Sequence, residues 1–496
     1  MPKVILMNEI MTDGIGDFSH FLDIYLFLRE HHATCQFELI PVICFDRDPV
    51  KPNAERQFNK ILSIIKSNNI PLYFYGDKEA YDKDISKNTA LIQCFTEAVQ
   101  IINISYPAVG FFTKLLSYVH PKARLKSIGE HEFDFSPQGW MSRSLGLGSN
   151  SYGIKCKQIE RLEPADAFSV IAHYNPLFTN MLLKVTGSDS FFSFQENNIL
   201  TSAYFQPERT TDLKLFLLLF SVNQSLPKNK DIAVYLSSNG ANNFVDEINN
   251  ATEFKEILSN SDLKRIEWIF SDDSQSSIEI NLTGNRVIRV FLGFHLCDTS
   301  YSALYQCLEI ALVTGDNTLE QAISSCVLPV YRSFNYSYKS RTLWALVNII
   351  KETLGSAPAK LLQDMQLFFE YAPVSEMGGY QRCSKTYAQF AEEYKDMDLI
   401  SMIKVWPVVA KHIQDKYNFF DKLEEIFFED LDPELLAIAY DQESKGIKQD
   451  LRPQVVFSQQ ERCSFFSRDK NKFFIGGAVA ATAAAASCIY WASCAL

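Results

Sequence analysis

The sequence predicts an α/β protein with two Rossmann-like domains that face each other across a cleft, followed by a C-terminal helical extension and an apolar tail. Over the first 200 residues, short apolar runs alternate with amphipathic stretches, and a second alternating series of similar size begins near residue 232. Short apolar strands separated by helices favour parallel sheets that are covered on both faces. Beyond about residue 340 the strand signals fade, and helical patterns replace them.

Composition narrows the class of protein. The 496 residues allow two or three domains, at about 150 residues per domain. The 47 Lys and Arg against 59 Asp and Glu leave a net charge of −12. No nucleic-acid partner is expected, because phosphate binding needs clustered basic side chains. The eleven Cys form no C-x-x-C pair, and Cys44, in an apolar run, is expected to be a small buried hydrophobe. The N-terminal apolar run is too short for a secretory signal, so a reducing, cytosolic compartment is expected for the body.

The first series contains strands and helices in alternation. The strands are expected at Val4–Asn8, Phe37–Phe45, Leu72–Tyr75, Leu125–Gly129 and either Thr89–Cys94 or Val99–Ile104. Helices are expected at Asp17–Glu30 and Ala54–Ser67, the second because its apolar residues share one helical face. Met141–Ile154, rich in Ser and Gly, is expected to be a loop. Within it, Gly146–Ser151 would be a mobile loop over the cleft or only a linker.

The second series repeats the pattern. Its strands are expected at Ile232–Leu236, Arg265–Phe270, Arg286–Leu292, Ile310–Val313 and Val327–Tyr331, with helices at Ala241–Ser259 and Tyr301–Cys307. Long helical patterns follow at Arg341–Leu354 and Lys385–Phe428, the latter interrupted at Pro407, where a helix must kink or stop. The resulting domains are 1–200, 201–345, a helical extension at 346–462 and a tail at 473–496.

The first chemical motif is DGIGD at residues 13–17, after the first strand and before a helix. Gly14 and Gly16 let the backbone turn sharply and approach a ligand closely. Asp13 and Asp17 would lie at the carboxyl end of the first strand, where open α/β sheets bind ligands, so either carboxylate is a candidate general base. The alternative is a plain Asp turn with Asp17 as the N-cap. The third glycine of the dinucleotide fingerprint is missing.

The second motif, TGDNTLEQA, begins at Thr314 and opens a helix after an apolar run. A residue from Asp316 to Thr318 would be the N-cap, and the exposed backbone N–H groups suit a diphosphate. Glu320 falls in the first turn, where the helix dipole favours an acid. A capped helix without a ligand is the alternative. The groups of a phosphate site here would come from Gly315, Asp316, Asn317, Thr318 and Leu319.

Together the two motifs resemble those of GT-B glycosyltransferases, most of all the inverting arginine rhamnosyltransferase type that modifies elongation factor P. Members of that family carry an Asp-rich turn after the first strand and a G-E-D-S-type turn that opens a donor-binding helix. Asp13 and Asp17 match the first turn, and Gly315–Thr318 match the second with Asp for Glu, Asn for Asp and Thr for Ser. The resemblance covers residues 1–350 in architecture but only a few dozen residues in motif. Because of the substitutions, the identity of the donor does not carry over.

The resemblance implies a metal-independent glycosyltransferase without a cofactor, which moves a sugar from a nucleotide-diphosphate-sugar donor to a protein or other acceptor. Asp13 or Asp17 would activate the acceptor in the first domain. The donor would lie at Gly315–Leu319 in the second, with Gly14 and Gly16 close to it. Tyr301, near the start of the preceding helix, would stack on the nucleotide base, or would be an ordinary core aromatic. Glu130, His131 and Glu132 would line the acceptor side; they have no second ligand pair, so no metal is expected.

The tail, Phe473–Leu496, has 24 residues without a charge. A helix of that length extends about 36 Å, enough for a hydrocarbon core of about 30 Å. Arg468, Lys470 and Lys472 flank its expected cytosolic side. The sequence therefore predicts a cytosolic-facing protein anchored to a membrane by its tail, an arrangement expected of a bacterial effector in a host cell. The alternatives are a buried C-terminal helix or a secretion signal, since Ala is only weakly apolar.

Two other functions are compatible with these residues. One is a non-catalytic, membrane-tethered interaction protein that reuses the fold. The other is a nucleotide-sugar epimerase, a class that also uses two Rossmann-like domains.

Overall fold

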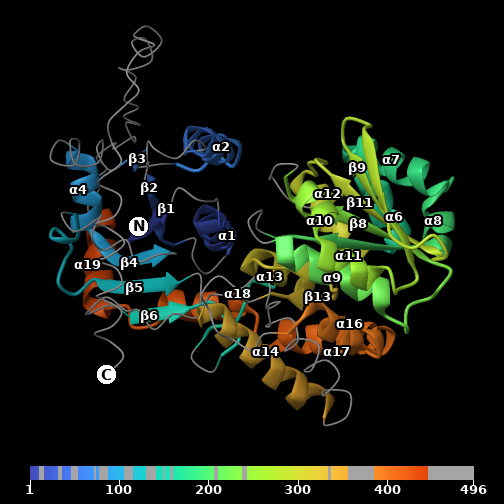
Figure 1. Ribbon diagram of the computed structural model, residues 1–496. Coiled ribbons are helices and arrows are strands. Elements are labelled where there is room, and N and C mark those ends of the chain that lie inside the picture. The colour runs from blue at the N-terminus through green and yellow to red at the C-terminus, as the bar shows by residue number, and fades with distance from the viewer. Residues whose placement is uncertain are drawn as a thin grey trace, which may run out of the picture. The chain divides into compact units, whose positions relative to one another are not determined.

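The computed structural model describes two α/β lobes and a set of C-terminal helices (Figure 1). The described residues are 1–10, 16–31, 36–45, 54–71, 74–77, 88–104, 115–129, 141–148, 151–156, 159, 161–205, 210–236, 243–332, 337–355 and 385–444.

The first lobe contains a parallel sheet in the order β3-β2-β1-β4-β5-β6. Its strands are β1 (Lys3–Ile10), β2 (Glu38–Phe45), β3 (Phe74–Asp77), β4 (Ala98–Ile104), β5 (Arg124–Gly129) and β6 (Met141–Ser144). Because β1 pairs with β2 on one side and β4 on the other, the chain changes direction across the sheet between β1 and β4. That point is the topological switch point of the first sheet.

Both faces of the first sheet are buried, as its apolar strands predict. Along β1, Val4 and Leu6 point to one face and Ile5 and Met7 to the other. The first face packs against α1 (Gly16–Glu30) and α2 (Ala54–Ser67), and the second against α4 (Thr89–Thr96). Cys44 is fully buried in the second face, which confirms its expected role as a small hydrophobe.

The second lobe contains a sheet in the order β10-β9-β11-β8-β7-β12-β13. Its strands are β7 (Asn198–Ala203), β8 (Asp231–Leu236), β9 (Leu263–Phe270), β10 (Gln275–Glu279), β11 (Arg286–Leu292), β12 (Ile310–Val313) and β13 (Leu328–Tyr331). All neighbours are parallel except the β9–β10 hairpin. Since β8 and β12 flank β7, the switch point of this sheet lies between β7 and β12.

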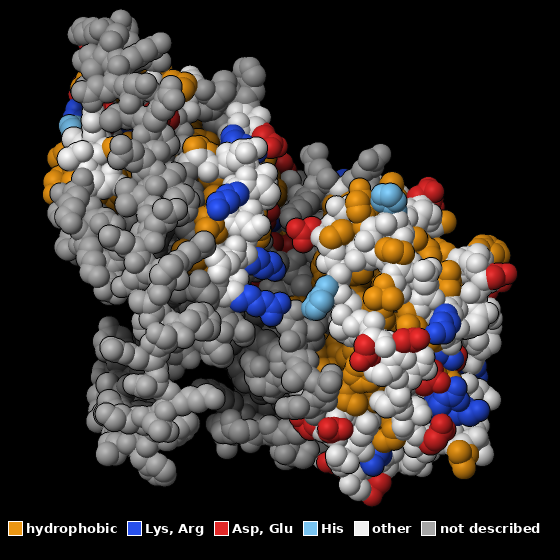
Figure 2. Space-filling model, turned by 90° about the horizontal axis from the view of Figure 1, so that it is seen from above, with side chains coloured by type: hydrophobic (Ala, Val, Ile, Leu, Met, Phe, Trp, Pro, Cys, Tyr) orange, Lys and Arg blue, Asp and Glu red, His pale blue; other side chains and the backbone are white. Residues whose placement is uncertain are grey.

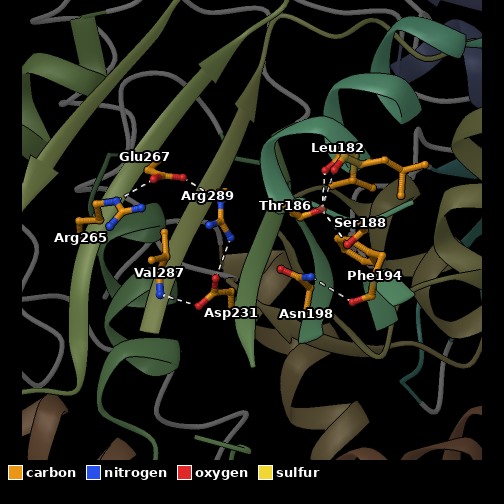
Figure 3. A network of polar contacts seen from close by, with 11 residues as sticks. Leu182, Thr186, Ser188, Phe194, Asn198, Asp231, Arg265, Glu267, Val287 and Arg289 are labelled. Carbon is orange, nitrogen blue, oxygen red and sulfur yellow. Dashed lines mark hydrogen bonds and ion pairs between the residues drawn. The ribbon is translucent and has the colours of Figure 1, made fainter. Parts of the chain in front are cut away.

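Ion pairs tie the strands of the second sheet together. In Figure 3, Asp231 of β8, Arg289 of β11 and Glu267 of β9 form a row across neighbouring strands, which Arg265 extends. Arg289 lies 2.8 Å from both Asp231 and Glu267. Because Arg289 is 9% exposed, its charge is largely removed from water and needs both carboxylates. The row therefore specifies strand register.

The second core begins earlier than the sequence suggested. It includes Leu147 and Ile154, and three helices precede its first strand: α6 (Pro164–Tyr174), α7 (Pro176–Thr186) and α8 (Phe191–Asn197). The expected boundary at residue 200 would cut through β7. The apolar run of β7 is too short for the sequence pattern to distinguish it from α8, the helix before it. Phe191 and Phe194 are buried in this core, whereas Phe192 is 72% exposed.

The remaining helices of the second lobe cover its sheet. They are α9 (Thr210–Val222), α10 (Asn243–Asn250), α11 (Thr252–Leu258), α12 (Asp298–Gln306) and α13 (Asp316–Ser324). In α9 every residue from Leu213 to Phe220 is buried, as expected of a helix that is apolar on all sides. α14 (Ser337–Leu354), α16 (Tyr387–Lys395) and α17 (Leu399–Lys416) also contribute to this core.

The last two described helices belong to the first core instead. α18 (Phe419–Phe428) contributes Phe419, Leu423 and Phe427 to the face of the first sheet that α1 covers, and α19 (Pro433–Ser444) contributes Leu435. Figure 1 shows α19 beside β4, from which it is far removed in sequence. The side chain of Lys126 in β5 donates to the carbonyl of Ile426 at 2.5 Å. It thereby satisfies a carbonyl at the end of α18.

Several expected elements differ from the structure. Thr89–Cys94 lies in a helix, α4, whose N-cap Asn88 accepts from the Leu91 amide, so Val99–Ile104 was the correct alternative. The expected helix Ala241–Ser259 is two helices that are separated at Ala251. Met141–Ser144, expected in a loop, forms edge strand β6.

Pro407, where the sequence predicts that the helix kinks or stops, does not end its helix. α17 runs unbroken from Leu399 to Lys416. Met402, Trp406, Val409 and Ile413 form one buried stripe along it. Packing of that stripe against the second core compensates for the backbone hydrogen bond that proline removes.

The described surface is mixed in character. Figure 2 shows side chains of both charges, with hydrophobic ones scattered among them, on the described part of one face. Among the residues that the structure describes, no helix is both long and apolar enough to span a bilayer. The predicted tail, Phe473–Leu496, lies outside those residues, as does the polar stretch beyond residue 444.

Candidate functional site

The described part of the first motif, Gly16 and Asp17, lies at the switch point of the first sheet. Asp17 is in the first turn of α1, half-buried, at the carboxyl end of β1. Asn8 of β1 donates to the carbonyl of Ile104 at 3.0 Å and to the carbonyl of Asp17 at 3.4 Å. Asn8 therefore joins the end of β4 to the start of α1. Asp13 and Gly14 lie outside the described residues.

Buried polar side chains surround this switch point. Asn8 and His20 are 0% exposed and Asn103 1%. Asn103 donates to the hydroxyl of Ser127 at 3.4 Å. Sequence reasoning missed all four, although asparagines inside the apolar strands VILMNEI and VQIINI were a visible signal. Polar groups in an apolar strand are costly unless they are paired or used.

The second motif lies at the switch point of the second sheet. Tyr204, which follows β7, donates its backbone N–H to the carbonyl of Leu312 at 3.0 Å. The hydroxyl of Thr314, which follows β12, donates to the carbonyl of Tyr204 at 3.1 Å. A side-chain carbon on Gly315 would lie 3.2 Å from the Tyr204 ring, so a larger residue there would require the ring to move by a few tenths of an ångström. Burial raises the pKa of Tyr204, which stays protonated near neutrality.

The first turn of α13 is ordered by its own side chains. Gly315 is the N-cap, and the Thr318 hydroxyl donates to its carbonyl at 2.7 Å. The Tyr331 hydroxyl donates to the Asp316 carboxylate at 3.1 Å. Leu319 is buried and anchors the turn in the core. The first backbone N–H groups of a helix have no partner within the helix, which is why such a turn suits an anion.

A fully buried ion pair lies just after β13, the strand next to β12. Arg332, directly after β13, and Asp212 of α9 are 1% and 2% exposed at their side chains, with Arg332 Nε 2.6 Å from Asp212 Oδ1. The pair joins α9 to the carboxyl end of β13. Removal of either partner would leave a buried charge unpaired.

Tyr301 lies in the first turns of α12, as the sequence suggested. Its ring is 6.4 Å from the ring of Tyr235, and its hydroxyl is 3.4 Å from that of Tyr305. It is only partly buried, and it packs against the second core. Both expected roles, core aromatic and base-stacking ring, are compatible with this position.

Lys155 connects α1 and α13, and sequence reasoning missed it. Its ammonium is 3.0 Å from the Asp23 carboxylate of α1, and 3.1 Å from the Asn317 side-chain oxygen of α13. The Glu320 carboxylate lies 3.5 Å from the same ammonium. Burial raises the pKa of Glu320 to about 7, and the positive charge of Lys155 opposes that rise. No motif could have revealed Lys155, because its partners come from distant parts of the chain.

The described residues hold no group of three or more His, Cys, Asp and Glu side chains placed to bind a metal ion. Glu130, His131 and Glu132 lie outside those residues.

No protein-family model and no curated protein sequence matches the chain. Among solved structures, a UDP-GlcNAc 2-epimerase from Neisseria meningitidis bound to UDP-GlcNAc is similar over 86% of this chain and 98% of its own, at 9% identity and a TM-score of 0.41. A glycosyltransferase from Rickettsia africae is similar over 87% of this chain and 99% of its own, at 9% identity and a TM-score of 0.42. An alpha,alpha-trehalose-phosphate synthase (UDP-forming) from Burkholderia vietnamiensis is similar over 87% of this chain and 99% of its own, at 9% identity and a TM-score of 0.39. At these identities and TM-scores the likenesses do not identify the activity of this chain.

Proposed function

We propose that the protein is a GT-B type glycosyltransferase that moves a sugar from a nucleotide-diphosphate-sugar donor to an acceptor, such as a protein side chain. One observation supports the proposal: Gly16 and Asp17 of the first motif, and α13, which begins within the second motif, lie at the switch points of the two sheets. Ligands of open α/β sheets bind at the carboxyl ends of the strands at such points.

In this proposal the donor diphosphate lies at the first turn of α13. Gly315 lets the backbone approach the phosphates, and the backbone N–H groups of the turn bind them. Charge develops on the departing diphosphate in the transition state, so fixed N–H dipoles here would stabilise it. Tyr301 would stack on the base of the nucleotide.

The acceptor would be activated from the first lobe. Asp17 or Asp13 would take the proton from the incoming hydroxyl or nitrogen as it attacks the anomeric carbon of the sugar. The bond from that carbon to the diphosphate oxygen then breaks, and the nucleoside diphosphate leaves with the electron pair.

The proposal is tested by nucleotide binding and sugar transfer. Nucleoside diphosphates should raise the melting temperature of the wild-type protein, and Asp17→Asn should keep that shift while turnover falls by about 10²–10⁴-fold. The surface variant Asp273→Asn should behave as wild type, since its side chain is 60% exposed in the second lobe. If no nucleoside diphosphate stabilises the wild type, the glycosyltransferase proposal is wrong.

Product analysis separates the alternatives. An epimerase would release an epimer of the donor sugar without an acceptor, whereas a non-catalytic interaction protein would release no product.

We also propose that residues 473–496 tether this body to a membrane, with the catalytic lobes on the cytosolic side. The support is their uncharged composition and the basic residues before them. A chain that ends at Lys472 should then move from the membrane to the soluble fraction of cells and keep its nucleotide binding. Equal fractionation of both chains would contradict the tether.

A further inference from the structure

Lys155 is buried, and its side chain contacts one helix from each lobe, α1 from the first and α13 from the second. Its side chain is 2% exposed, and its ammonium contacts Asp23 of α1 at 3.0 Å. The same ammonium contacts Asn317 and Glu320 of α13 at 3.1 and 3.5 Å. The backbone N–H of Lys155 also donates to Glu320 at 3.0 Å. One residue thus holds both helices.

The backbone that carries Lys155 is itself held in place. The preceding residue, Ile154, donates its N–H to the Tyr417 carbonyl and accepts from the Phe419 N–H, both at 2.8 Å. Gly153 approaches so closely that a side-chain carbon there would lie 2.1 Å from the Tyr417 carbonyl oxygen. Lys155 is therefore presented from a paired segment of backbone.

Stability alone is a weak explanation for this lysine. A buried ion pair typically contributes little compared with well-packed apolar side chains, because both charges lose their hydration. What such a pair does supply is a defined geometry for the elements that carry its members. Here those elements are α1, with Asp17 in its first turn, and α13, whose first turn includes Asn317.

We infer that Lys155 is a positioning residue that couples α1, which carries the proposed base, to α13, which carries the proposed donor site. The inference rests on the proposed function, since only a reaction between groups on both helices requires their spacing to be set. Lys155 acts through Asp23 on one side and through Asn317 and Glu320 on the other.

The test compares hydrogen exchange and kinetics in three variants of the full chain. Lys155→Met removes the charge, but it also strands the Glu320 carboxylate in the core. Lys155→Met/Glu320→Gln removes the charges of Lys155 and Glu320, so it breaks the connection and leaves Asp23, whose side chain is 19% exposed, as the remaining carboxylate. Lys184→Met is the matched control, because Lys184 pairs with Asp273 at the surface of the second lobe with both side chains at least 60% exposed.

In the double variant, amides of α1 and α13 should exchange at least about tenfold faster than in wild type, while those of β11, an interior strand of the second sheet, stay unchanged. Turnover should fall on the order of 100-fold, because displaced reacting groups lose their alignment. Nucleoside diphosphate affinity should stay within about threefold of wild type. Lys184→Met should match wild type in all three measurements.

Two results would overturn the inference: wild-type exchange in both helices, or a uniform increase across all helices and strands, which would indicate general destabilisation. Hydrogen exchange of the amides is measured without any substrate. If the wild type binds no nucleoside diphosphate, the proposed function fails, and exchange still decides whether Lys155 couples the helices.

Discussion

Glu320 shows at the level of one residue how burial changes a familiar side chain. A glutamate in the first turn of a helix is ordinarily stabilised by the helix dipole. Here the carboxyl is 6% exposed, and burial raises its pKa to about 7. Lys155 opposes the rise, whereas Asp23 and Asp316 add to it.

The raised pKa predicts how stability depends on pH. Between about pH 4.5 and 7 the folded protein holds a proton on Glu320 that the unfolded chain has already lost, so the contribution of Glu320 to the free energy of unfolding decreases as pH rises. That contribution is complete below the pKa of Glu320 in the unfolded chain, and it is lost as pH rises through the pKa of Glu320 in the folded protein. Glu320→Gln should therefore flatten the decrease in melting temperature between about pH 5 and 7.5.

Thermal unfolding at closely spaced pH values measures this effect. Glu253→Gln, at an exposed position in α11, serves as the control and should keep the wild-type profile. Parallel profiles for wild type and Glu320→Gln would contradict the buried, protonatable carboxyl.

At the scale of elements, two chain segments that cross between the lobes pair with each other. Ile154 forms a parallel bridge with Asn418, and Gly153 has a φ of +100°. Non-glycine residues rarely adopt this backbone conformation. Gly187, the C-cap of α7, also has a positive φ, +65°, but has open space where a side chain would lie. Comparing the two positions therefore separates the effect of a steric collision, present only at Gly153, from the effect of a positive φ, present at both.

Substitution of each glycine should show that difference. Gly153→Ala should lower the free energy of unfolding by more than about 3 kcal/mol, because its side-chain carbon collides with the Tyr417 backbone. Gly187→Ala should cost only about 1 kcal/mol, the conformational penalty alone. Urea titration of both variants measures the difference, and equal losses would show that the Gly153 contact is not tight.

At the scale of the whole molecule, the C-terminal helices belong to the first core although they come after the second in the chain. α18 contributes Phe419, Leu423 and Phe427 to it. Gln100 of β4 donates to the carbonyl of Phe427 at 3.1 Å. The first lobe is therefore complete only when the chain has returned from the second.

Two truncations should separate the role of α18 and α19 from that of the residues after Pro453. The last described helix ends at Ser444, so a chain that ends at Pro453 keeps every described element and should be soluble, with the melting temperature of the chain that ends at Lys472. A chain that ends at Tyr417 lacks α18 and α19, exposes the apolar face of the first sheet and should aggregate on expression. Soluble expression of the shorter chain with an intact first lobe would contradict this packing.

The two βα series, most strands of the described sheets and the two motifs can be predicted from the sequence, because each depends on local periodicity or on a few adjacent residues. β11 and β12 have the bounds that their apolar runs predict, and α13 begins at the predicted turn. The sequence did not reveal Lys155, whose partners lie 132 and 162 residues away at Asp23 and Asn317. Nor did it reveal that α18 covers the first sheet or that α17 continues through Pro407. Only the tertiary structure decided these features, because each depends on the burial of side chains against residues that are distant in the chain.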